Sequence, residues 1–163
     1  MLIIAKSLNE LTFSGLMAVY TEGNLDMGRE RWPEESEGRQ LMLAEEEFYN
    51  YLRQVFFPTK GAAYLIWEER GSYVSALRLE PYQDGLLLEA LETAPEQRRK
   101  GYAAALVRTV LEQYRNVRIY SHVAKGNTAS RRTHEACGFR KILDHAVYAD
   151  GSVLRSSVTY CHE

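Results

Sequence analysis

Three adjacent cations and a glycine stand at the start of the most strongly periodic helical segment of the chain. The segment reads Arg98-Arg99-Lys100-Gly101-Tyr102-Ala103-Ala104. Unpaired amides at a helix start bind anions, whereas each cation there opposes the helix dipole by about 0.3 to 1 kcal/mol. Gly101 costs a further 0.8 to 1 kcal/mol, roughly, relative to Ala. A bound polyanion would remove both conflicts; a surface helix with a basic start is the alternative interpretation.

Two glutamates precede this segment on a predicted strand. A partly buried carboxylate has a raised pKa and can accept a proton near neutral pH, which makes Glu89 and Glu92 candidate general bases. Their spacing of three places them on opposite faces of a regular strand, unless a bulge intervenes. We favour Glu89. The alternative is that both carboxylates are solvated beside Arg or Lys.

The elements that must position these residues follow from the hydrophobic pattern. Residues 1–5 predict a first strand, 8–22 a helix, 23–38 a long polar loop and 39–57 a helix ended by Pro58. An antiparallel meander is predicted over 62–68, 73–79 and 86–93. A helix over 103–114, a strand over 117–123, a short helix over 127–137 and a hairpin over 139–160 that turns at Asp150-Gly151 complete the chain.

This order of elements predicts the fold class. Hairpins in the middle and alternating strands and helices after them favour an α/β fold. We expect a single mixed, mostly antiparallel sheet of about seven strands with helices on both faces. At 163 residues the chain is expected to form one domain, 1–163.

Two motifs in the second half resemble a known family. Arg98-Arg99-Lys100-Gly101-Tyr102-Ala103 is similar to the R/Q-x-x-G-x-G/A pyrophosphate loop of the GNAT superfamily of acetyltransferases. Further on, Asn127 opens a helix that leads to Gly138-Phe139, which resembles the family's N-(x)10-G-F segment. Both motifs occur in the family's order, and the resemblance is close over residues 86–148.

The resemblance implies a donor and a site. Acetyl-CoA would be the acyl donor, and the thioester would lie between the strands 86–93 and 117–123. Amides from Arg99 through Ala104 would bind the pyrophosphate, and Leu91 and Thr93 would offer backbone bonds to the pantetheine. The implied cofactor-binding residues are Leu91, Thr93, Arg98, Arg99, Lys100, Gly101, Tyr102, Ala103, Ala104 and Asn127.

The implied acceptor is a primary amine of a small molecule or peptide. Such an amine is mostly ammonium at pH 7, so a base must remove a proton, and Glu89 or Glu92 is assigned that role. Many relatives use a Tyr as the acid seven residues after the helix-opening Asn. His134 stands at that position here, either as the acid or as a packed or solvated histidine.

Composition limits the other functions and partners. A net charge of −2 gives no basic surface for nucleic acid, and the five apolar residues at the start are too few for a membrane span. The His and Cys residues lack the spacing of a metal site, and two cysteines favour a reducing, cytoplasmic location. A homodimer is expected by analogy with relatives.

Two alternatives to a working N-acetyltransferase stay open on the sequence. One is a non-catalytic acyl-CoA-binding or sensor module that kept the pyrophosphate loop and lost the acid. The other is a nucleotide-binding protein, against which the absence of G-x-x-x-x-G-K-[ST] argues.

Overall fold

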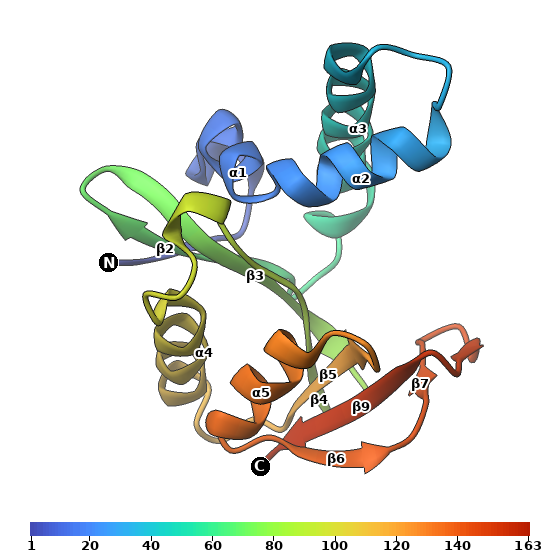
Figure 1. Ribbon diagram of the computed structural model, residues 1–163. Helices are drawn as coiled ribbons and strands as arrows, with labels where there is room; N and C mark the ends of the chain where they lie inside the picture. Colours follow the sequence, from blue (N-terminus) through green and yellow to red (C-terminus); the bar gives the residue numbers. More distant parts are fainter.

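The computed structural model describes residues 1–163 and centres on one seven-stranded sheet (Figure 1). Its strand order is β1-β2-β3-β4-β5-β9-β6, and only the β4–β5 pair is parallel. The strands are β1 Leu2–Ala5, β2 Ala63–Glu69, β3 Ser72–Tyr82, β4 Gly85–Thr93, β5 Ile119–Ala124, β6 Arg140–Leu143 and β9 Ser157–His162. The predicted fold class is therefore confirmed.

Helices cover both faces of the sheet because successive strand residues point to opposite sides. On one face, Tyr64 and Ala76 pack against α1 (Phe13–Val19) and the π-helical turn η2 (Leu52–Phe56). On the other face, Leu65 and Leu77 pack against α4 (Tyr102–Gln113), and α5 (Thr128–Ala136) lies beside it. We call these the α1–α3 face and the α4 face. Each fully buried leucine contributes about 1.5 to 3 kcal/mol of transfer free energy.

The N-terminal third differs from the expectation. The segment predicted as one helix over 8–22 is a short 3₁₀ turn, η1 (Leu8–Glu10), followed by α1. The predicted loop over 23–38 is wrong, because Thr21–Arg31 forms α2 and only residues 32–36 connect it to α3 (Glu37–Tyr51). Gly28 lets the two helices approach closely, since a Cβ there would lie 2.7 Å from the Gln40 carbonyl oxygen.

The remaining predicted elements are present with small shifts of their ends. The meander turns at residues 83–84, so β3 continues through Pro81 and Tyr82. Asn127 caps α5 by accepting a hydrogen bond from the Ser130 amide at 3.1 Å. Gly138 follows α5 with φ of 92°. A 3₁₀ turn, η3 (Pro95–Gln97), links β4 to α4.

The C-terminal hairpin is more elaborate than predicted. β6 pairs with β9 as expected, and between them β7 (Ala146–Val147) and β8 (Val153–Leu154) form a separate two-stranded sheet. The turn at Asp150-Gly151 is present, with the Ser152 amide donating to Asp150 Oδ1 at 2.9 Å. None of the helices combines the length and the apolar character needed to cross a membrane.

Candidate active site

The loop before α4 presents a row of unused backbone donors. Arg99 and Gly101 adopt left-handed conformations, with φ of 63° and 82°. The first helical bond of α4 runs from the Ala105 amide to the Gly101 carbonyl, at 2.9 Å. None of the six amides from Arg99 through Ala104 donates a hydrogen bond within the protein. Consecutive free amides in such a conformation form an anion-binding concavity at a helix start.

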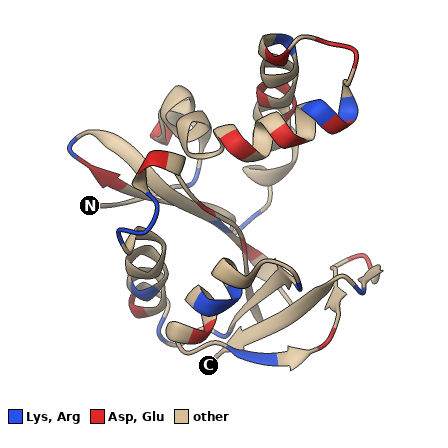
Figure 2. Ribbon diagram, in the orientation of Figure 1, with Lys and Arg blue, Asp and Glu red and all other residues tan.

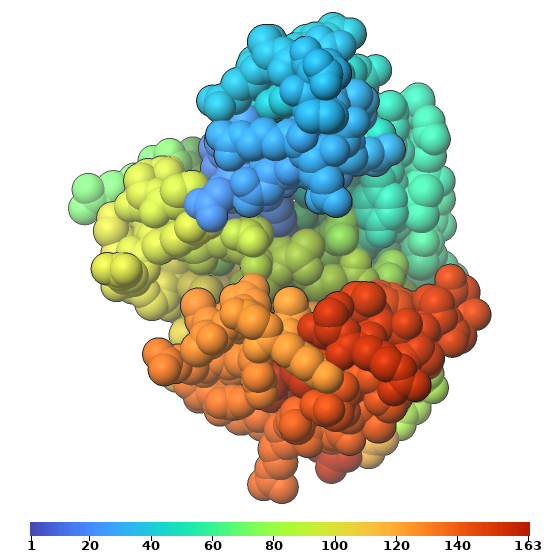
Figure 3. All heavy atoms as spheres, turned by 45° about the vertical axis from the view of Figure 1, so that its right-hand side comes forward, coloured from blue at the N-terminus to red at the C-terminus, as the bar shows by residue number.

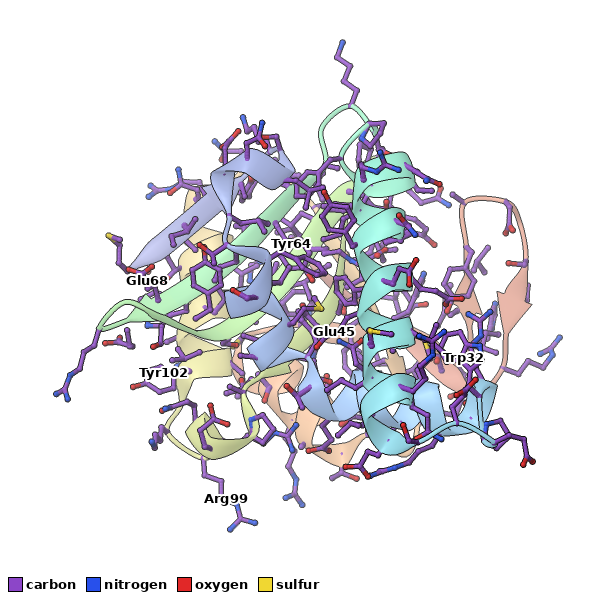
Figure 4. All side chains as sticks on the ribbon, turned by 90° about the horizontal axis from the view of Figure 1, so that it is seen from above. Trp32, Glu45, Tyr64, Glu68, Arg99 and Tyr102 are labelled. Atoms are coloured by element: carbon purple, nitrogen blue, oxygen red, sulfur yellow. The ribbon has the colours of Figure 1, made fainter.

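These amides border a cavity of about 580 Å³ between β4, α4 and α5, which we call the α4 cavity. It contains nine of the ten predicted cofactor-binding residues, with Lys100 outside it because its ammonium contacts Gln97 Oε1 at 2.9 Å. Arg99 projects from the loop into solvent in Figure 4. The lining is Glu22, Leu91, Glu92, Thr93, Gln97, Arg98, Arg99, Gly101, Tyr102, Ala103, Ala104, Asn127, Ala129, Ser130 and Thr133.

Five of the lining residues were not among the site residues predicted from the sequence: Glu22, Gln97, Ala129, Ser130 and Thr133. Ser130 follows Asn127 by three residues and Thr133 follows Ser130 by three, so each pair is adjacent on the helix surface, a signal that was available in the sequence. Ala129 lines the cavity beside them. Glu22 had no such signal, because it reaches the cavity from α2, most of which was predicted as a loop.

Arg98, in the loop before α4, forms ion pairs with residues of α2 and β4. Its guanidinium lies 2.8 Å from the Glu22 carboxylate on α2 and 3.6 Å from that of Glu92 on β4. It also donates from Nε to the Thr93 carbonyl at 3.3 Å. Figure 2 shows acidic positions on α2 and basic positions in the loop before α4. The Arg98 guanidinium could therefore release these acceptors and bind an anionic ligand in the cavity instead.

A bulge in β4 brings the two candidate bases to the same face. Arg78 pairs with Glu89 and Ala76 with Glu92, so two steps along β3 oppose three steps along β4. Ala90, inside the bulge, has φ of 53°, and its carbonyl accepts a 2.6 Å hydrogen bond from the buried Tyr20 hydroxyl. Both carboxylates therefore lie on the α1–α3 face, as the sequence spacing allowed only with a bulge.

The surroundings of the two carboxylates differ. Burial raises the pKa of Glu89 to about 7; the Arg78 guanidinium, 3.1 Å away, opposes this rise, and nearby Glu80 adds to it. Burial also raises the pKa of Glu92, and the Arg98 guanidinium opposes this rise. The side chain of Glu89 is 23% exposed and that of Glu92 41%. Glu89 thus combines partial shielding from solvent with a pKa near the operating range of a general base.

The parallel strands β4 and β5 separate beside these residues. Their pairing extends only from Leu86 opposite Ile119 to Leu88 opposite Ser121, although both strands continue beyond it. The backbone of β4 beyond Leu88 therefore has no strand partner on the β5 side. Figure 3 shows the surface hollowed here, between the α1–α2 region in blue and the α5 and hairpin regions in orange and red.

His134 lies outside the cavity, within the core of the α4 face. Only 1% of the residue is exposed, and its ring stacks 5.7 Å from Tyr160. Its Nδ1 lies 2.7 Å from the Ser130 carbonyl, which can only accept, so Nδ1 carries the proton and Nε2 accepts from the Ser121 hydroxyl at 2.9 Å. Burial lowers the pKa of His134. The structure therefore does not bring His134 to the other predicted site residues.

Comparisons with known proteins agree with this geometry. The model of the acetyltransferase (GNAT) family matches residues 24–139. A search of curated proteins finds no significant match.

Solved structures with the same fold include three named acetyltransferases. The PaiA N-acetyltransferase of Thermoplasma acidophilum, in complex with coenzyme A, has a TM-score of 0.64 at 12% identity, over 100% of this chain and 99% of its own. An Elizabethkingia anophelis GNAT acetyltransferase with acetyl-CoA bound has a TM-score of 0.56 at 13% identity, over 72% and 82%. The Escherichia coli ribosomal-protein-S18-alanine N-acetyltransferase has a TM-score of 0.58 at 17% identity, over 99% and 92%. At these identities the likeness shows the fold.

Proposed function

Since this chain belongs to the acetyltransferase (GNAT) family, we propose that it transfers the acetyl group of acetyl-CoA to a primary amine of a small molecule or peptide. Acetyl-CoA-dependent acetyl transfer is the activity of the family; the amine and the roles of individual residues are our proposal. The observation that carries it is the row of six free amides, Arg99 through Ala104, at the cavity that also contains Glu92 of the bulged strand.

The α4 cavity suits the coenzyme A part of the donor. The pyrophosphate would accept hydrogen bonds from the free amides, with Arg98 and Arg99 supplying charge and Tyr102 to Ala104 forming the helix start. Two structural relatives were solved with coenzyme A or acetyl-CoA bound. The unpaired edge of β4 at Leu91 and Thr93, opposite Asn127, would hold the pantetheine arm.

Glu89 is the general base in this proposal. An amine with a pKa of about 10.4 is almost wholly ammonium at pH 7 and must lose a proton before it can attack the thioester carbonyl. Glu89 takes that proton directly or through a water molecule, the new C–N bond forms, and the C–S bond breaks. Glu92, nearer the cavity and engaged by Arg98, is the second candidate.

The departing thiolate is protonated from solvent or from hydroxyls at the cavity wall. A thiolate with a free pKa near 8.5 is a moderate leaving group, and a positioned acid assists it without being essential. His134 has both ring nitrogens engaged in the core, so we assign it a structural role. Ser130 and Thr133 line the cavity instead.

The acceptor enters along the α1–α3 side of the hollow. α2 carries Glu22 and Asp26, and residues 1–60 hold 10 acidic against 6 basic side chains. A field of this sign draws ammonium groups toward the carboxylates of β4. We further infer a single catalytic domain over 1–163, a cytoplasmic location from the two unpaired thiols, and a homodimer by analogy, which light scattering tests.

A thiol-release screen tests the proposed function. Purified protein is mixed with acetyl-CoA and each of a lysyl peptide, an alanyl N-terminal peptide, a diamine and an aromatic amine. Release of free coenzyme A with at least one amine, and an acetylated product by mass spectrometry, is the expected result. Tight acetyl-CoA binding without turnover of any amine would instead identify a binding or sensor module.

A further inference from the structure

We propose that Arg78 is a positioning residue for Glu89 and that the rings of Tyr51 and Phe56 clamp its guanidinium in place. The proposal rests on the proposed function of Glu89 as general base. Arg78 comes from β3, and the two rings come from the end of α3 and the π-helical turn η2. The clamp thus connects the acceptor-side helices to the base.

The first part of the argument is the ion pair itself. Arg78 and Glu89 are directly paired across β3 and β4, with a guanidinium nitrogen 3.1 Å from a carboxylate oxygen. Their side chains are 16% and 23% exposed. A planar guanidinium fixes the direction of a carboxylate as a flexible ammonium cannot. The contact between Arg78 Nη2 and Glu89 Oε2 therefore constrains the orientation of the carboxylate.

The second part is the stacking that holds Arg78. Its guanidinium carbon lies 4.9 Å from the centre of the Tyr51 ring and 5.6 Å from that of Phe56. Tyr51 and Phe56 are brought to the same cation because the helix widens into a π turn between them, a feature often found at functional sites.

The third part is an unsatisfied donor. Arg78 Nε is buried and has no hydrogen-bond partner, and neither has the hydroxyl of Tyr64, which lies opposite Arg78 on β2. Figure 4 shows Tyr64 in the interior, among side chains of the covering helices. Unpaired buried donors lower stability, and an apolar side chain at position 78 would avoid this cost. The ion pair with Glu89 gives the guanidinium at this position a role that an apolar side chain could not take.

The electrostatic balance at Glu89 points the same way. Burial raises the pKa of its carboxyl to about 7, while Arg78 lowers it and Glu80 raises it. Without Arg78 the carboxyl of Glu89 would be protonated in a larger fraction of the molecules at neutral pH and would serve less often as a base. The other ionisable groups on this face or around the pair are Tyr20, Tyr51, Tyr64, Glu80, Glu92, Tyr120 and His122.

The experiment measures the Glu89 carboxyl directly and does not depend on knowing the acceptor. The protein is labelled with ¹³C at glutamate Cδ, and its signals are titrated by NMR, the Glu89 signal being assigned by its loss in Glu89→Gln. Arg78→Met should raise the measured pKa by about one unit or more, the usual effect of losing an opposite charge at this range. Arg78→Lys should hold the pKa near that of the wild type.

Rates with the amine that gives most thiol release provide the second readout. Arg78→Met should lower the rate at pH 7 about fivefold or more and move the ascending limb of the pH–rate profile to higher pH. Arg78→Lys should lower kcat with little change in the dissociation constant of acetyl-CoA. Tyr51→Leu should lower kcat a few-fold, and the same change in the Arg78→Met background should not. Tyr49→Leu is the matched control, since Tyr49 lies on the same helix and packs edge-to-face against Phe13.

The outcomes separate this inference from the proposed function. If Glu89→Gln leaves the rate and its pH dependence unchanged, Glu89 is not the base and the proposed function fails in that part. A second outcome overturns only the positioning role. In it, Glu89→Gln abolishes the ascending limb of the pH–rate profile, but Arg78→Met moves neither that limb nor the NMR pKa of Glu89. A melting curve checks that Arg78→Met is folded. Equal effects of Tyr51→Leu and Tyr49→Leu on kcat would contradict the proposed clamp.

Discussion

The two halves of the proposed site, the loop before α4 and the carboxylates on the α1–α3 face, use different chemical groups. Around α4 the proposed ligand-binding groups are backbone amides that have no acceptor within the protein, and Gly101 contributes a left-handed backbone and no side chain. On the α1–α3 face the proposed active groups are side chains: Glu89 is paired with Arg78 from β3, and Arg78 is contacted by rings from α3 and η2. Donor binding should therefore depend on local backbone conformation, and proton transfer on long-range packing.

The largest expected effect comes from breaking the side-chain half alone. Glu89→Gln removes the base and keeps the shape, so kcat should fall by about 10² to 10⁴. Acetyl-CoA should bind as in the wild type, because the free amides lie on another element. Steady-state rates and calorimetric titration measure the two quantities. A rate within threefold of the wild type would transfer the role of base to Glu92 or to water.

A smaller effect, on acetyl-CoA binding, is expected from changing side chains of the loop before α4. Arg99 lines the cavity, and its loss in Arg99→Ala should weaken acetyl-CoA binding about tenfold, the value of one charge-assisted hydrogen bond. Lys100→Ala is the matched control: its ammonium is bound to Gln97 and lies outside the cavity, so binding should change less than twofold. Equal losses in both variants would indicate general attraction by positive charge.

The smallest effect concerns stability and pH. The folded-state pKa of Glu89, about 7, lies above the ordinary glutamate value of 4.5, so the folded protein binds this proton more tightly than the unfolded chain does. Its contribution to stability is therefore present below pH 4.5 and is lost as pH rises through about 7. Urea unfolding should show wild type losing stability relative to Glu89→Gln over this window. The reverse trend would mean that the Arg78 ion pair dominates.

The same division explains what the sequence could predict. The α4 loop was predictable because its proposed function lies in consecutive residues, where three cations and Gly101 conflict with ordinary helix preferences. α2 was not predictable in this way, because Gly23 and Gly28 favour a loop locally. The reason for a glycine at position 28 is its close approach to Gln40 on α3, which the local sequence does not reveal. Arg78 was missed for a related reason: its pairing with Glu89 depends on strand register and on the bulge at Ala90.

His134 illustrates the limit of carrying a role along a motif. Its spacing from Asn127 placed it at the expected position of an acid, but the side chain is directed into the core by Ser121 and Tyr160, on two other strands. No local pattern encodes these partners.

The central claim, that the amides before α4 bind the donor, is tested most directly by calorimetric titration of acetyl-CoA into wild type, Gly101→Glu and Gly71→Glu. Both glycines have left-handed φ, 82° and 80°, and neither has an atom within 4 Å of an added Cβ, so the backbone strain is matched. Only Gly101 borders the cavity. Wild type and Gly71→Glu should bind alike, while Gly101→Glu should bind at least about 100-fold more weakly because its carboxylate opposes the pyrophosphate. Undiminished binding by Gly101→Glu would contradict the account.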